Sequence, residues 1–388
     1  MLTRKGIKLI GIFFLIVILF FSCGKRKPLW NGKIVEENGI KIIKNPKEPI
    51  YPDKIIEFEE DLVIGIEKGE ENYIFNQPID IDSDSDGNIY ILDFGDVTLK
   101  KFDRKGRLIK NIGGKGQGPG EFQRPSSFYI SENKGLYIVD SETDRILIFN
   151  LDGDYIESIF FPNVNGFSTD RNEKIIMSYS SPVQGEKKEL LIFYKVGVYN
   201  PKENRMKDFY SQEQPWPNRL AGDATFLSPY LVKWTMDSAD NIYVGTATQY
   251  EVSVFSMDLS LLFKFNWDFK PIPVTGEAER KLTEILQQYR NFTDISKAKK
   301  TLKFYPVFYS FSVDEKDRFW IESYPLDGIN NIKAKTLYNV FSSEGKFLFS
   351  ASIDTHVCSQ LIFKNGYLYL LITDKSGYIR AGRFIINE

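Results

Sequence analysis

The densest cluster of carboxylates in the sequence has the spacing of a calcium-binding loop. Asp82, Asp84 and Asp86 alternate with serines, Gly87 follows, and Asp93 stands at the twelfth position. EF-hand loops place ligands at positions 1, 3 and 5, glycine at 6 and a bidentate glutamate at 12. Here strand-like sequence flanks the loop, and aspartate is a poorer bidentate ligand than glutamate. Because Asp, Ser, Gly and Asn also form hairpin turns, we expect a turn and assign no metal site.

Two other patterns could carry chemistry and are better explained by structure. The run GGKGQGPGEF at 113–122 resembles a phosphate loop, but no Gly-Lys-Ser/Thr follows and no helix is expected after it. Its glycines suit a link that needs positive φ angles. His356, the single histidine, lies between two predicted strands, and no serine-elbow motif accompanies it. We therefore name no catalytic residue and expect no cofactor.

Composition excludes further classes of function. The 388 residues carry 50 Lys and Arg against 52 Asp and Glu, a net charge of −2 without the basic footprint that nucleic-acid binding needs. One histidine and two cysteines cannot build a multi-histidine metal centre, a Cys-rich zinc site or a disulfide framework. Hydrophobic residues make up 42% and aromatic residues 15%, so we expect a large folded core rather than a disordered chain.

The N-terminus predicts export. A basic segment at 4–8 precedes an apolar run at 9–21, which is shorter than the ~20 apolar residues of a membrane-spanning helix but suits a signal peptide. Ser22 followed by Cys23 resembles the lipobox of bacterial lipoproteins, which implies acylation of the Cys23 thiol and cleavage before it. An uncleaved short anchor or an ordinary signal peptide is the alternative. We expect a signal peptide at 1–22, a tether at 23–38 and a location in the bacterial cell envelope, on its periplasmic or outer-membrane face.

A repeat of 47 residues organises the rest of the chain. Pro78, Tyr90, Asp93, Phe102, Gly106 and Ile109 recur as Pro125, Tyr137, Asp140, Phe149, Gly153 and Ile156. Each copy holds four strand-like runs split by turn signals, which is the spacing of a β-propeller blade. Weaker copies bring the count to six, with strands starting near Ile89, Leu136, Lys174, Ile242, Phe319 and Leu368. The sequence predicts an all-β, six-bladed propeller of four-stranded blades over 39–388.

The last predicted blade has three strands of its own, so the ring needs a fourth from elsewhere. The segment GIKIIKNP at 39–46 is an isolated strand-like run at the start of the mature chain. Because an open blade edge would leave unpaired backbone groups, we expect 39–46 to pair onto the final blade and close the ring.

The two strongest repeats resemble NHL repeats. The shared features are the GPGEF-x-x-P link and the following strand pair GLYIVDSETDRILIF. The whole chain is similar to six-bladed propeller proteins that occur as bacterial lipoproteins, and the resemblance implies the fold and a diffuse function, since members bind proteins, RNA or sugars and some relatives are lactonases or lyases. The lyases hold zinc with several histidines, which this chain lacks. The lactonases use a divalent cation bound by carboxylates and amides in the channel, which needs no histidine.

Two insertions interrupt the repeat. Residues 275–300 place Leu282, Ile285, Leu286 and Tyr289 at helical spacing, which predicts an amphipathic helix that packs on the propeller or acts as a lid or docking element. Residues 210–230 are rich in proline and aromatics, and Trp216 there is a candidate channel plug or sugar-stacking platform.

These observations favour a membrane-anchored lipoprotein whose propeller is a binding or scaffolding module for a protein or a glycan. The alternative is a metal-dependent lactonase- or esterase-type hydrolase with its ion in the channel. Three or four carboxylate or amide side chains converging near the channel mouth would favour the hydrolase.

Overall fold

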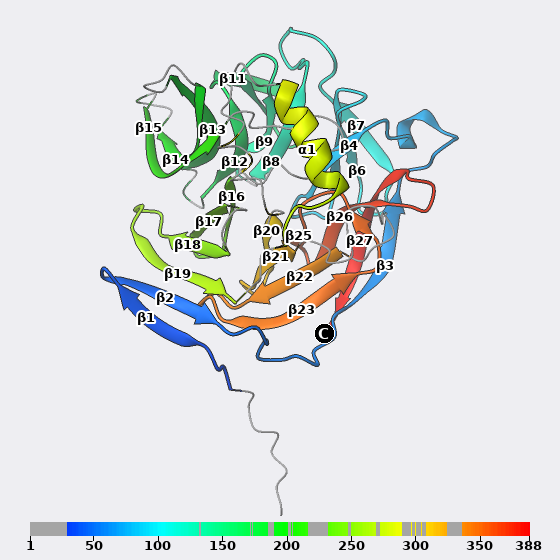
Figure 1. The fold of residues 1–388 in the computed structure, drawn as a ribbon. Coiled ribbons are helices and arrows are strands. Elements are labelled where there is room, and N and C mark those ends of the chain that lie inside the picture. The colour runs from blue at the N-terminus through cyan, green and yellow to red at the C-terminus, as the bar shows by residue number, and fades with distance from the viewer. Residues whose placement is uncertain are drawn as a thin grey trace, which may run out of the picture.

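The structure is a computed structural model that describes residues 29–388 apart from a set of gaps. The gaps fall at 132, 171, 173, 185–189, 201–202, 204, 216–231, 247–249, 269–271, 289–295, 297–298, 300–303, 305–307 and 324–335. Figure 1 shows six sheets set in a ring around a common axis. The prediction of an all-β, six-bladed propeller with four-stranded blades is confirmed.

The first three blades each use four consecutive strands, in order from the axis outward. The first blade holds β4 (Pro78–Ser83), β5 (Ile89–Asp93), β6 (Thr98–Phe102) and β7 (Leu108–Ile112). The second holds β8 (Pro125–Ser131), β9 (Gly135–Asp140), β10 (Arg145–Phe149) and β11 (Tyr155–Phe160). The third holds β12 (Val164–Thr169), β13 (Ile175–Gln184), β14 (Leu190–Asn200) and β15 (Arg205–Pro215). The innermost strand of the second blade, β8, contacts the innermost strands of both its neighbours, β4 and β12.

The last three blades complete the ring. The fourth holds β16 (Val232–Met236), β17 (Ile242–Thr246), β18 (Glu251–Phe255) and β19 (Leu261–Trp267). The fifth holds β20 (Phe308–Val313), β21 (Phe319–Ser323), β22 (Thr336–Phe341) and β23 (Phe347–Ile353). The sixth holds β24 (His356–Val357) and β25 (Ile362–Lys364), both paired with β26 (Tyr367–Thr373), then β27 (Ile379–Asn387).

The N-terminal segment wraps around the outer edges of three blades. The hairpin of β1 (Lys33–Glu37) and β2 (Ile40–Asn45) extends the fourth blade, because β2 pairs parallel with β19. The backbone N–H groups of Ile50 and Tyr51 then donate to carbonyls of β23 in the fifth blade. Finally β3 (Glu57–Ile64) pairs antiparallel with β27 in the sixth blade. We call residues 29–64 the N-terminal belt.

The belt corrects two expectations from the sequence. The final blade does take its fourth strand from the N-terminal region, but the strand is β3, and the predicted segment 39–46 lies on the fourth blade instead. Part of the expected tether, Lys33–Glu37, is a strand rather than a linker. Asn45 explains the placement of β2: its amide donates to the Asn266 and Gly345 carbonyls and accepts from the Phe347 N–H, so it joins the fourth and fifth blades.

The hydrophobic core is divided among the seams between blades. Each pair of neighbouring blades shares a cluster of buried aliphatic and aromatic side chains in the described part of the chain. The middle strands are buried on both faces, and all five residues of β5 are buried. Aromatic residues are concentrated in the fourth and fifth blades, where the rings of Tyr243 and Phe319 stack with centroids 4.7 Å apart. This packing of blade on blade holds the ring together.

A buried aspartate recurs in the hairpins between the first and second strands of the blades. Asp84 accepts from the N–H groups of Asp86 and Asn88 with one oxygen, and from the Asn88 amide and the Tyr90 hydroxyl with the other. Asp237 makes the same four bonds in the fourth blade with the residues at equivalent positions. Each aspartate therefore closes its turn and also anchors the following strand.

The third blade departs from this pattern. Asp170 accepts from the N–H groups of Asn172 and Lys174, but its second oxygen is buried without a partner among the described residues. The position six residues later, which is Tyr90 in the first blade, is Ile176, a fully buried side chain with no donor. The turn therefore forms with half of the hydrogen bonds.

The predicted helical insertion contains α1 (Glu277–Gln288), which lies in the connection from β19 to β20 (Figure 1). Leu282 and Leu286 are buried, so the predicted apolar stripe does pack inward. Tyr289 and most of the predicted range beyond it lie outside the described residues. No helix within the described ranges is long and apolar enough to cross a bilayer. A single turn of 3-10 helix, Glu71–Tyr73, lies between β3 and β4.

Candidate functional site

The connections between blades all leave the propeller at one end. In a blade of four antiparallel strands, the loop between the second and third strands and the link to the next blade lie at the same end. We call this end the link face. The helix α1 belongs to it, because α1 follows β19 and precedes β20, whereas residues 216–231 lie outside the described residues. The candidate site is a pocket on the link face.

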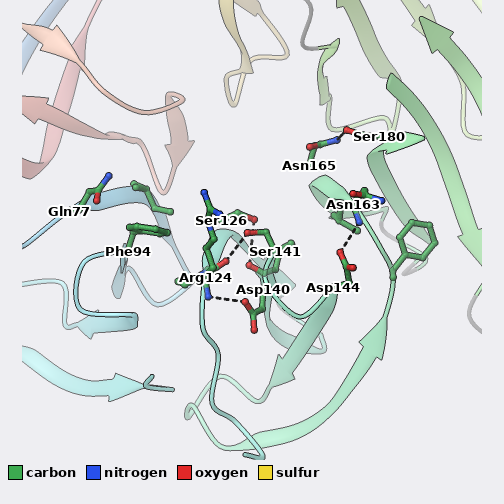
Figure 2. A pocket seen from close by; sticks show the side chains of 15 residues that line it. Gln77, Phe94, Arg124, Ser126, Asp140, Ser141, Asp144, Asn163, Asn165 and Ser180 are labelled. Atoms are coloured by element: carbon green, nitrogen blue, oxygen red, sulfur yellow. Dashed lines mark hydrogen bonds between the residues drawn. The ribbon is translucent and has the colours of Figure 1, made fainter. Parts of the chain in front are cut away.

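The pocket lies across the first three blades and has a volume of about 560 Å³. Figure 2 shows the polar side chains that surround it, together with Phe94. The lining residues are Gln77, Ile79, Phe94, Arg124, Pro125, Ser126, Val139, Asp140, Ser141, Asp144, Phe161, Asn163, Val164, Asn165 and Ser180.

Asp140 holds the floor of the pocket in place. Its carboxylate accepts from the N–H groups of Gln123 and Arg124 at 3.1 and 2.8 Å, and from the Thr143 hydroxyl at 2.6 Å. Asp93 does the same in the first blade, where it accepts from the N–H groups of Asn76 and Gln77. The repeated aspartate of the sequence is thus structural, because it ties each incoming link to the loop beside it.

The wall formed by the third blade is also fixed by hydrogen bonds. The Asn163 N–H donates to Oδ1 of Asp144 at 3.0 Å, and the Phe161 N–H donates to the Asp144 carbonyl at 2.8 Å. The side-chain amide of Asn165 donates to the Ser180 hydroxyl at 2.8 Å. The ring of Phe161 meets that of Tyr179 edge-on, 5.6 Å between centroids. The wall is therefore rigid although it is built from links.

Three polar side chains in the pocket are not held by hydrogen bonds or ion pairs to other described residues. Gln77, Arg124 and Asn163 are exposed, and their side chains make no hydrogen bond or ion pair within the described part of the chain. Each occupies the same structural position, immediately before the innermost strand of its blade. In Figure 2 they stand from left to right across the pocket. Three successive blades thus present an amide, a guanidinium and an amide that are free to bind a ligand.

Two buried carboxyl groups, Asp80 and Glu322, lie on the inner strands of the first and fifth blades. Asp80 accepts from the Phe128 N–H of the next blade at 3.2 Å, and burial raises its pKa to about 7. Burial likewise raises the pKa of Glu322 to about 7, while Ser310 donates to its carboxylate at 2.7 Å and the charge of Lys233 opposes the shift. Across the described residues, no three His, Cys, Asp or Glu side chains come together to hold a metal ion. The carboxylate part of the convergence that would favour a channel hydrolase is therefore not found in those ranges.

The candidate motifs of the sequence have structural roles where they are described. Residues 84–87 form the expected hairpin turn, with the Gly87 N–H donating to the Asp84 carbonyl, and Asp93 lies at the far end of β5 from that turn. The glycine-rich run is the link from β7 to β8, and Gly113 and Gly120 take positive φ angles of 74° and 78° as predicted. Trp216 and Cys23 lie outside the described residues.

His356 and Cys358 form a pair that is not activated. The Cys358 sulfur lies 3.3 Å from Nδ1 of His356 and 2.8 Å from the Thr373 hydroxyl. Burial raises the pKa of the Cys358 thiol and lowers the pKa of His356. A nucleophilic cysteine needs the opposite shift of its own pKa, because only the thiolate attacks. Cys358 is a free, half-buried thiol rather than a deeply buried one.

The ring of six blades, the seam-packed core and the closing strand from the N-terminal region define a six-bladed β-propeller. Residues 68–317, more than half of the chain, match the DUF5128 family, described as a 6-bladed beta-propeller. The chain belongs to that family. No curated protein matches the sequence.

Solved propeller structures resemble the chain in fold. A protein of Bacteroides fragilis predicted to be exported shares 12% identity at a TM-score of 0.55, covering 89% of this chain and all of that one. A member of the DUF4221 family from Bacteroides vulgatus shares 9% identity at a TM-score of 0.52, covering 86% of this chain and 99% of that one. At such identities the likeness concerns the fold alone.

Sequence reasoning missed the pocket. Its free side chains are polar, differ between blades and follow no strand periodicity, so they give no motif. One signal could have located them. Each stands directly before the innermost strand of its blade, and the 47-residue repeat already places Gln77 and Arg124 at equivalent positions beside Pro78 and Pro125.

Proposed function

We propose that this protein is an exported lipoprotein, anchored through Cys23, whose propeller binds a protein or a glycan on its link face. The observation that carries the binding function is the pocket across the first three blades, where Gln77, Arg124 and Asn163 are free to bind a ligand. Ligand pockets are typically concave sites with a few polar groups on a rigid scaffold. Asp140 and Asp144 supply that rigidity, since their hydrogen bonds fix the surrounding links.

Export is supported by the N-terminal sequence and by the solved Bacteroides fragilis relative, which is predicted to be exported. Anchoring is tested in cells that express the full chain with a radiolabelled fatty acid. We expect label and membrane fractionation in the native protein, and loss of both when Cys23→Ala is introduced. A native chain that carries no label would exclude the lipoprotein.

Binding is tested with the domain that starts at residue 24. Immobilised domain is incubated with an array of glycans and, separately, with solubilised envelope proteins, and each ligand found is measured again with a Gln77→Ala/Asn163→Ala double variant. Binding that the double variant loses supports the link face as the binding surface. Binding that the variant retains would place the ligand elsewhere on the propeller.

A further inference from the structure

We propose that the pocket binds an oligosaccharide that carries carboxylate groups, with Arg124 as the residue that selects the charge. The inference rests on the proposed binding function and names the ligand class of that same pocket. Its basis is the difference between the groups in the pocket that are already paired and those that are free.

Of the two carboxylates in the pocket, Asp140 is fully paired and Asp144 is paired through one oxygen. Asp140 is fully buried and accepts from at least four donors, including the N–H of Glu142 and the Thr143 hydroxyl. Arg145 adds a positive charge 3.7 Å from the same carboxylate. Asp144 accepts from the Asn163 N–H with one oxygen. Asp140 therefore has little capacity left for a ligand, and Asp144 has one free oxygen.

The positive group of the pocket is free. Arg124 is exposed, and its guanidinium has no ion pair or hydrogen bond with another described residue, although its backbone N–H and carbonyl are both bonded. A planar guanidinium with five donors binds a carboxylate through two parallel hydrogen bonds. Because the backbone of Arg124 is fixed by hydrogen bonds and its guanidinium is unpaired, the side chain can bind a carboxylate of a ligand.

The groups on either side of Arg124 suit hydroxyls and sugar rings. The amides of Gln77 and Asn163 each offer two donors and one acceptor oxygen, so each can bind neighbouring hydroxyl groups of a sugar. Phe94 and Phe161 are partly buried and line the pocket, where their rings can contact the C–H face of a pyranose. One free polar group from each of three blades fits a chain of sugar units better than a single small molecule.

The test compares acidic and neutral oligosaccharides of equal length by isothermal titration calorimetry. The acidic probes are hexamers of galacturonate, alginate and hyaluronan, and the neutral probes are the methyl ester of the galacturonate hexamer, a xylan hexamer and a galactan hexamer. We expect at least one acidic probe to bind, and its neutral counterpart to bind about 10- to 100-fold more weakly, as expected for loss of a charge-assisted bidentate pair.

The variants locate the effect. Arg124→Ala should weaken the acidic probe about 10- to 100-fold and leave the neutral probes unchanged, and Arg124→Lys should restore only part of the loss because lysine cannot bind bidentately. Arg104→Ala is the matched control, because Arg104 is an exposed arginine in the hairpin between β6 and β7, at the opposite end of the first blade. Arg104→Ala should change nothing.

The outcomes separate the two proposals. Equal binding of acidic and neutral probes, or acidic binding unaffected by Arg124→Ala, overturns the acidic-glycan inference while the glycan-binding function stands. Binding of a hexaglutamate peptide without binding of any sugar also overturns the inference and leaves a protein partner. If neither glycans nor envelope proteins bind, the proposed function itself is refuted.

Discussion

Substituting asparagine for aspartate should strongly destabilise one hairpin and leave the stability of an equivalent hairpin almost unchanged. Asp84 is 3% exposed, and each of its two oxygens accepts two hydrogen bonds. Oδ2 accepts from the Asn88 side-chain amide and the Tyr90 hydroxyl. Asp84→Asn places an NH₂ group against those two donors. Hydrogen bonds to a charged group contribute about 1.5–3 kcal/mol each, so we expect the loss of two to cost roughly 3–6 kcal/mol.

Asp170→Asn is the matched control. Asp170 is 5% exposed, but its second oxygen has no described partner, because Lys174 and Ile176 stand where the first blade has Asn88 and Tyr90. An asparagine there keeps the oxygen that accepts from Asn172 and Lys174 and places its NH₂ where no donor stands. We expect the free energy of unfolding to change by less than about 1 kcal/mol, since no hydrogen bond of the turn is lost.

Urea denaturation at pH 7, followed by tryptophan fluorescence, measures the stability of both variants. If the dependence of the unfolding free energy on urea concentration stays the same, the change in midpoint gives the change in stability. The reasoning is refuted if the two substitutions destabilise equally, or if Asp84→Asn costs less than about 1 kcal/mol. Tyr90→Phe isolates the hydroxyl. It should lose about 1–3 kcal/mol, because Asp84 then keeps a buried oxygen with one donor fewer.

The pKa of Asp80, raised to about 7 by burial, makes stability fall as pH rises from about 4 to about 7, because the unfolded chain releases its proton first. Between pH 4 and pH 8, the free energy of unfolding of Asp80→Asn should therefore rise by about 1–3 kcal/mol relative to that of the native chain. A pKa unit corresponds to up to ~1.4 kcal/mol, and partial exposure of the side chain reduces this value. A difference in urea midpoint between variant and native chain that is the same at both pH values would contradict this. Truncation divides the N-terminal belt into two parts with different roles. A chain that starts at residue 47 should melt cooperatively at a lower temperature, whereas one that starts at residue 66 lacks β3 and should show no cooperative transition by circular dichroism. A cooperative melt of the shorter chain would show that the ring does not need its closing strand.

The sequence was sufficient for the blades because their signal is local and repeated. Tyr90 and Tyr137 stand at equivalent positions of buried middle strands, and the turn residues between the strands recur with them. The closing strand was not predictable in the same way. The segment EFEEDLVI that forms β3 has four acidic residues, all exposed at the outer edge. It therefore lacks the apolar run that made 39–46 the better candidate.

The pocket was beyond sequence reasoning for a different reason. The links around it contain Gln77, Arg124 and Asn163, which are three residue types with no shared periodicity. They come together because the ring places equivalent positions of successive blades side by side. A repeat can reveal that such positions are equivalent, but the meaning of the residues there depends on which of their atoms are already paired, and only the structure gives that.

The N-terminal belt has a consequence for the order of events during synthesis. β3 is among the first segments to leave the ribosome, yet its partner β27 ends one residue before the C-terminus. Until the last strand is made, β3 has no partner, the sixth blade is missing, and the apolar seams on either side of it are open to solvent. Pairing between distant segments is also intrinsically slow. The ring therefore cannot close until β27 has been synthesised, however early the strands of the first five blades fold.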